Sequence, residues 1–232
     1  MKYIKKFFKT YPHVYTFIIG LILLVWFETL EKVIPPSKAE HIMHIRLDDY
    51  IPFVKYFIIP YLFWFFYIGI TLTYLFFKSK SDFLKLSAFL YIGMGICYIT
   101  YMVYPNGQDL RPILTDTDIF TRLVRFIYST DTPTNCCPSI HVIDSLAVHA
   151  AIMNYDGFKN KKWIKSASFI IMCLICISTV TLKQHSCIDG FIGMGLSLVL
   201  YIGIYKIDRE TVKEKIRAKQ NKKSMIKQEK YN

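Results

Sequence analysis

The sequence has too few polar residues for a soluble protein, and it lacks the cysteine patterns and internal repeats that mark several other protein classes. Hydrophobic residues make up 53% of its 232 residues, more than the core of a soluble protein of this length would hold. Its six cysteines are too few for a disulfide scaffold and do not form the two matched pairs of a zinc site. No internal repeat is visible, and low complexity is confined to the lysine-rich tail after Ile207. These absences favour a chain that is solvated by lipid.

Long apolar runs predict six membrane-spanning helices, because about 20 apolar residues cross the hydrocarbon core. The expected spans are 14–33, 52–77, 84–104, 138–155, 163–182 and 187–207. The predicted fold class is therefore an all-α bundle of six transmembrane helices over residues 1–207, followed by a disordered basic tail over 208–232. The lysines before the first span are typical of a signal peptide, but no small-residue cleavage site follows them. We therefore expect this segment to remain uncleaved and to form the first membrane span.

The basic charge predicts how the spans are oriented. The net charge is +12, and the cationic residues cluster between apolar spans, which disfavours nucleic acid as a partner. With the N-terminus inside, 21 of the 29 Lys and Arg residues fall on the inner side and 8 on the outer side. The positive-inside rule then predicts a multi-pass cell-membrane protein with both termini cytoplasmic.

The long outer loop 105–137 contains a further helical signal. Apolar residues recur at helical spacing between 120 and 128, with arginines between them. They predict a short helix, either lying on the outer membrane surface or packed as an ordinary loop helix.

Polar residues in or beside the spans collect at the predicted outer ends, where three sequence-distant clusters can meet. His185 and Asp189 are four residues apart and would share one face of a helix. A carboxylate beside an imidazole fixes its tautomer and makes it a better base or nucleophile. His141 and Ser139 lie at the start of the fourth span, where free N–H groups of a helix N-terminus suit a phosphate.

Two cationic residues complete this candidate site. Arg111 follows the third span and Lys183 follows the fifth, and arginine can bind phosphate with two parallel hydrogen bonds. Histidines, a carboxylate, cations and a helix N-terminus together favour phosphoryl transfer through a phosphohistidine. We find no carboxylate cluster that suggests a metal site.

These residues resemble the signatures of the type 2 phosphatidic acid phosphatase (PAP2) superfamily of membrane lipid phosphatases and phosphotransferases. Its three signatures are approximately Lys-x6-Arg-Pro, Pro-Ser-Gly-His and Ser-Arg-x5-His-x3-Asp. They have their counterparts here in Tyr104-x6-Arg111-Pro112, Pro138-Ser139-Ile140-His141 and Ser178-Thr179-x5-His185-x3-Asp189. The resemblance covers roughly residues 50 to 205.

The resemblance implies a role for each matched residue. His185 would attack phosphorus, and Asp189 would orient it. His141 would protonate the leaving alkoxide and then activate the incoming water or alcohol. Arg111 would hold the phosphate, with Lys183 and Ser139 as further phosphate-binding candidates. The family needs no metal and no cofactor.

The sequence departs from the family at three positions. Tyr104 and Thr179 replace two cations, and Ile140 replaces a glycine. These changes make the site more similar to the branch of inositol-phosphorylceramide-synthase-like phosphotransferases. A less cationic pocket suits a phosphodiester or a less charged head group better than a dianionic monoester. The substrate remains open between a phospholipid and an isoprenyl phosphate or diphosphate.

Several alternatives remain beside an enzyme acting on lipid phosphates at the outer face. A non-catalytic lipid-binding relative is one, and a small transporter is another, although transport would spread polar groups through the depth of the spans. Membrane lipids are the expected partners, and the oligomeric state stays open. Either Cys136 or Cys137 could pair with Cys187, or all three could be free thiols.

Overall fold

Five helices of the computed structural model, which describes residues 2–207 and residue 218, are long and apolar enough to cross a membrane. Each falls where an apolar run predicts a span, and the structure as a whole is mostly helical. The first, α2, is preceded by a 3-10 turn at Pro12–Tyr15, and the last, α9, continues as a π-helical segment at Ile202–Ile207. The five are α2 (Thr16–Val33), α4 (Ile58–Lys78), α5 (Lys80–Val103), α8 (Lys162–Thr181) and α9 (Cys187–Tyr201).

The predicted fourth span is a shorter helix than expected. This helix, α7 (Ile140–Asn154), has 15 residues, which corresponds to a length of about 22 Å. It packs against α4, α5, α8 and α9, so its neighbours bury its polar residues, including Asp144 and Ser145. The prediction of six spans is thus confirmed for five helices, and the sixth element is a short apolar helix inside the bundle.

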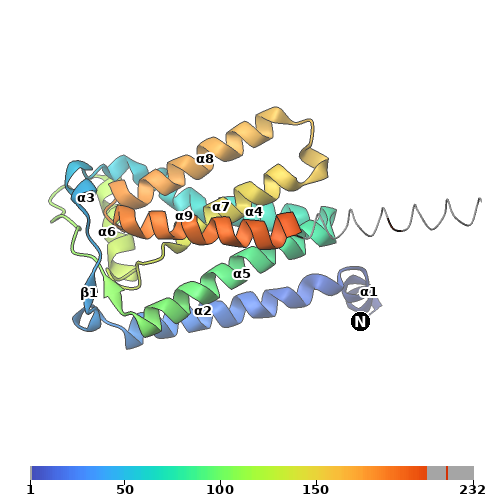
Figure 1. Ribbon diagram of the computed structural model, residues 1–232, viewed down its shortest axis with the longest axis horizontal. Helices are drawn as coiled ribbons and strands as arrows, with labels where there is room; N and C mark the ends of the chain where they lie inside the picture. Colours follow the sequence, from blue (N-terminus) through green and yellow to red (C-terminus); the bar gives the residue numbers. More distant parts are fainter. Residues whose placement is uncertain (1, 208–217, 219–232) are drawn as a thin grey trace, which may run out of the picture.

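Short elements gather at one end of the bundle (Figure 1). They are α3 (Arg46–Tyr50), α6 (Ile119–Thr130) and two-residue strands β1 (His41–Ile42) and β2 (Asn106–Gly107), which pair in parallel. The helix predicted within the 105–137 loop is confirmed as α6. Its buried residues Val124 and Ile127 belong to a cluster with Ile58, Tyr61 and Leu182, so α6 packs onto the bundle as a loop helix.

The opposite end carries α1 (Lys2–Thr10) and the C-terminal end of α9 (Figure 1). The sequence reasoning did not anticipate α1 as a separate helix. The predicted basic tail 208–232 lies outside the described residues, apart from residue 218.

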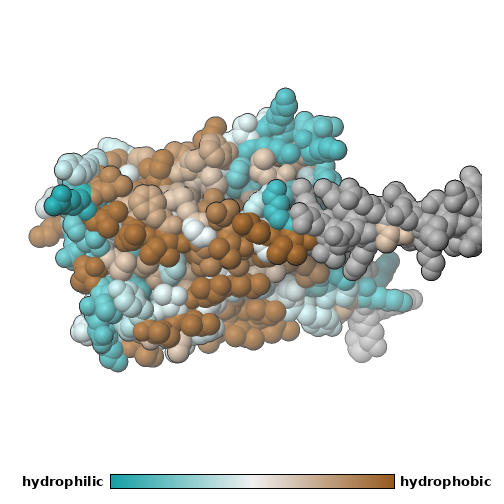
Figure 2. Space-filling model, viewed as in Figure 1, coloured by the Kyte–Doolittle hydropathy of each residue, from teal (hydrophilic) through white to brown (hydrophobic). Residues whose placement is uncertain are grey.

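The bundle presents apolar side chains outward as well as inward. Leu24 and Val25 of α2, for example, are 60% and 68% exposed. Figure 2 shows a hydrophobic band across the middle of the molecule, with hydrophilic residues at its two ends. A surface of this kind is unfavourable in water and suits the hydrocarbon of a bilayer.

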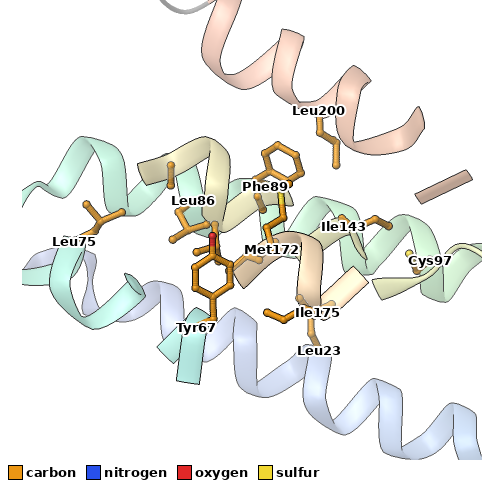
Figure 3. Packing of buried hydrophobic residues seen from close by; sticks show 14 of the residues in the cluster. Leu23, Tyr67, Leu75, Leu86, Phe89, Cys97, Ile143, Met172, Ile175 and Leu200 are labelled. Carbon is orange, nitrogen blue, oxygen red and sulfur yellow. The ribbon is translucent and has the colours of Figure 1, made fainter. Parts of the chain in front are cut away.

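Inside the bundle, residues of several helices form one core (Figure 3). Tyr67 of α4, Phe89 of α5, Ile143 of α7 and Met172 of α8 all belong to it. Close contact between α5 and α7 depends on Gly93, where an added Cβ would lie 2.8 Å from Ile143 Cγ2. This packing holds α7 in the centre of the bundle and thereby positions the residues at its N-terminal end.

Candidate active site

His185 lies in the tight turn that joins α8 to α9. Lys183 adopts a left-handed conformation with φ of 54°, and the backbone N–H groups of Gln184 and His185 both donate to the carbonyl of Thr179, at 2.9 and 3.1 Å. The sequence predicts that His185 and Asp189 share a helix face. In the structure, His185 instead precedes Ser186, the N-cap of α9, because the turn separates it from the helix.

The predicted pairing of the imidazole with the carboxylate nevertheless occurs. His185 Nδ1 is 3.4 Å from Asp189 Oδ2, and the backbone N–H of Ser186 donates to the same oxygen at 3.0 Å. Asp189 is fully buried and forms a capping box with Ser186. A carboxylate held in this way fixes the orientation of the ring.

The start of α7 is tied to the start of α9. Ser139 is the N-cap of α7, and its backbone N–H donates to the backbone carbonyl of Asp189 at 3.1 Å. The two helices approach closely at Gly193, where a Cβ would meet the carbonyl oxygen of Ser139 at 3.1 Å. The Ser139 hydroxyl is buried without a hydrogen-bond partner among the described residues.

This link brings the two candidate histidines together. His141 Nδ1 lies 3.3 Å from His185 Nε2. The ring centroids of Tyr61 and Trp64, both on α4, lie 4.7 and 4.6 Å from that of His141. Two aromatic side chains therefore hold the His141 imidazole against His185. The structure brings together the three residues predicted to be catalytic: His141, His185 and Asp189.

The Arg111 guanidinium is bound by groups other than the two histidines. It donates to the backbone carbonyls of Tyr128 at 3.2 Å and Asp131 at 2.9 Å. It also donates to the side-chain oxygen of Gln184 at 2.5 Å and lies over the Tyr128 ring, 4.4 Å from its centroid. Through these contacts, Arg111 joins α6 to the turn that carries His185.

Lys183 points away from the histidines. Its ammonium donates to the backbone carbonyl of Asp48 at 2.8 Å, and the side chain is largely buried. The structure therefore does not bring Lys183 to the candidate phosphate position, because this contact holds its ammonium group at α3.

Asp48 is a site residue that the sequence reasoning missed. Its carboxylate accepts hydrogen bonds from Ser186 Oγ at 2.5 Å and from the backbone N–H of Cys187 at 2.8 Å. Burial alone would raise the pKa of this carboxyl group, but the hydrogen bonds from Ser186, Cys187 and Ile45 outweigh burial and lower the pKa. The loop helix α3 therefore supplies a buried anion that holds the first turn of α9.

Asn106 is a second residue that was not singled out. Its side-chain oxygen accepts from the backbone N–H groups of Cys136 and Cys137, at 2.9 and 2.8 Å, and its amide donates to the Cys137 carbonyl at 3.0 Å. It fixes the segment that leads into α7. Its only sequence signal is the turn-forming run Pro105-Asn106-Gly107 after a span. All six cysteines are free thiols, so neither proposed pairing with Cys187 is present.

A cavity of about 310 Å³ opens beside the two histidines. His141, His185 and Gln184 form part of its wall. Most of the other lining residues are apolar or aromatic, largely from α2, α4 and α5, and the segment 130–135 adds polar side chains. Leu24 of α2 and Phe65 of α4 border the cavity and are 60% and 58% exposed on the apolar surface of the bundle. The cavity thus combines a polar corner, which holds the two histidines, with walls suited to a hydrocarbon chain.

Asp131 also borders the cavity, directly after α6. Tyr61 donates to its carboxylate at 3.4 Å. Burial, aided by the nearby carboxylate of Glu31, raises the pKa of Asp131 to about 6. Because it is ionised at neutral pH, Asp131 places a negative charge close to the histidines.

No family model, curated protein or solved structure matches this chain.

Proposed function

We propose that this chain is an integral-membrane phosphatase or phosphotransferase of the PAP2 type, which acts on lipid phosphates through a phosphohistidine at the outer membrane face. The observation that carries the proposal is the 3.3 Å contact between His141 Nδ1 and His185 Nε2. Two imidazoles at this separation, one backed by a buried carboxylate, can divide nucleophilic attack and proton transfer between them.

In the first half-reaction, His185 Nε2 attacks phosphorus. A nitrogen–phosphorus bond forms while the bond from phosphorus to the lipid oxygen breaks, and its electron pair stays on that oxygen. Protonated His141 donates its proton to the departing oxygen. Asp189 stabilises the positive charge that develops on the His185 ring, because its Oδ2 faces Nδ1 at 3.4 Å.

In the second half-reaction, His141 takes a proton from a water molecule or a lipid alcohol. The resulting oxygen nucleophile forms a bond to phosphorus, and the bond to His185 Nε2 breaks. Hydrolysis and head-group transfer differ only in this acceptor.

The cavity supports a lipid as the substrate. It meets the apolar surface at Leu24 of α2 and Phe65 of α4. These two helices also contact each other away from the cavity, where the rings of Phe17 and Phe76 are 5.7 Å apart. A phosphate ester at the histidines can extend its hydrocarbon chain along this wall.

The proposal includes six spans with both termini in the cytoplasm, α7 being the short span that starts at the site. The excess of Lys and Arg in the segments predicted to be cytoplasmic, 21 against 8 in the sequence, supports this orientation. So does the position of α1 and the C-terminal end of α9 at the same end of the molecule (Figure 1).

The test is an assay of the purified protein in detergent with EDTA present, against a panel of lipid phosphates. The wild type should release phosphate or exchange head groups, and His185→Ala should abolish both. The matched control is His149→Ala, because His149 is on the same helix as His141 but contacts Ser168 at 2.8 Å instead of the cavity. Full turnover by His185→Ala, or equal loss in the two variants, would contradict the mechanism.

A non-catalytic lipid-binding role is the second candidate. It is favoured by the engagement of Arg111 with Gln184 and of Lys183 with Asp48, which leaves neither cation directly at the histidines. Lipid binding without any turnover in the same assay would support it.

A further inference from the structure

The charge of the cavity wall opposes a highly anionic substrate. Among the described residues that line the cavity, Glu28 and Asp131 are acidic and none is Lys or Arg. The two candidate phosphate-binding cations are held elsewhere: Arg111 by Gln184 and two carbonyls, and Lys183 by Asp48. A phosphate monoester is close to dianionic at neutral pH, so it would meet two acidic side chains on a wall that has no cation of its own. The Arg111 guanidinium contacts the backbone carbonyl of Asp131 but does not border the cavity.

The same wall is rich in aromatic rings. Tyr61, Trp64 and Tyr98 line the cavity. Of the three, Trp64 is the least buried, and its ring lies next to that of His141. Faces of aromatic rings attract ammonium groups, most strongly quaternary ones, when the site is shielded from water. Tyr61 also donates its hydroxyl to Asp131 at 3.4 Å, so this carboxylate borders the aromatic part of the wall.

We propose that the substrate is a phosphodiester lipid with a positively charged head group, of the choline or ethanolamine class. This inference rests on the proposed function and specifies its substrate. The phosphorus lies at His185, and the ammonium group lies in the cavity against the Asp131 carboxylate and the aromatic part of the wall. The acyl chains follow the apolar wall towards Leu24 and Phe65. The bond that breaks joins phosphorus to the glycerol oxygen, which receives the proton from His141, so the head group stays on phosphorus.

The experiment compares lipids with identical acyl chains in mixed micelles: phosphatidylcholine, phosphatidylethanolamine, phosphatidylglycerol and phosphatidic acid. Phosphatidylglycerol is a phosphodiester without the cation, so it separates the effect of the ester from that of the head-group charge. We expect kcat/KM for the two cationic head groups to exceed that for the other two lipids by about tenfold or more. The choline and ethanolamine arms show whether the aromatic surface or the carboxylate contributes more.

Asp131→Asn tests the carboxylate. It should lower kcat/KM for phosphatidylcholine by about tenfold and leave that for phosphatidylglycerol unchanged or higher. Asp109→Asn is the matched control, because Asp109 is an exposed acid of the same outer loop and should change neither value.

Lipid binding to the His185→Ala protein tests the inference even if no lipid is turned over and if the Asp131→Asn protein does not fold. Radiolabelled dihexanoyl phosphatidylcholine should bind about tenfold more tightly than dihexanoyl phosphatidic acid. Faster turnover or tighter binding of phosphatidic acid would overturn the head-group assignment and leave the proposed function intact. Absence of turnover on every lipid, with choline-selective binding, would overturn the proposed function and support the head-group assignment.

Discussion

Replacing Asp48 by Asn should displace residues of the candidate site, although Asp48 itself does not border the cavity. The Asp48 carboxylate accepts three hydrogen bonds: from Ser186 Oγ at 2.5 Å, from Cys187 N at 2.8 Å and from Ile45 N at 2.9 Å. Hydrogen bonds to a charged group contribute about 1.5–3 kcal/mol each. The amide keeps one acceptor oxygen and points a donor at another donor.

From this geometry we expect the free energy of unfolding to fall by about 3 kcal/mol. The same contacts hold the turn that carries His185, and a displacement of about 1 Å at a reacting group can lower the rate about 100-fold. We therefore expect kcat to fall between about 10-fold and 100-fold, with KM changing little because Asp48 does not line the cavity.

Thermal unfolding in detergent and steady-state turnover measure the two effects. The control is Asp49→Asn, since Asp49 is the neighbouring residue but pairs with His44 at 2.8 Å and its side chain is 60% exposed. An exposed pair of this kind contributes at most about 1 kcal/mol. Equal behaviour of the two variants, or a loss of stability in Asp48→Asn with kcat unchanged, would refute a positioning role.

Three further variants test the cations and the buried acid. Because the pKa of Asp131 is raised from its ordinary value of 3.8 to about 6, the protonated side chain contributes fully to stability below pH 3.8, and this contribution is lost as the pH rises through 6. Asp131→Asn should therefore be more stable than the wild type at pH 8, by up to about 3 kcal/mol, and equal to it at about pH 3. A difference in unfolding midpoint between the two proteins that does not change with pH argues against this reasoning. Arg111→Lys keeps a positive charge but loses the planar guanidinium that joins Tyr128, Asp131 and Gln184. Turnover should fall about tenfold or more, and a kcat equal to that of the wild type would show that the guanidinium is dispensable. Lys183→Met should lower the unfolding midpoint and change KM for the lipid less than about threefold, because the ammonium contacts a carbonyl of α3 instead of the cavity; a large rise in KM would restore Lys183 as a phosphate ligand.

Local composition was sufficient to predict where the long helices lie. Each of the five membrane-capable helices falls on an apolar run, because hydrocarbon accepts only a backbone whose polar groups bond within the segment. The short helix α6 followed from its own apolar periodicity. α7 begins two residues later than the span predicted from the sequence, since its start is set by the contact of Ser139 with α9.

The sequence by itself also determined the partnership of His185 with Asp189, because residues four apart stay close whether they lie in a helix or in the turn before it. Only the tertiary structure decided the roles of residues that meet across long separations. Asp48 reaches Ser186 over 138 positions, Lys183 turns towards Asp48, and Arg111 is held by Gln184. A buried charge pairs with the donors or acceptors that the packed helices bring to it, and these partners cannot be predicted from spacing along the chain.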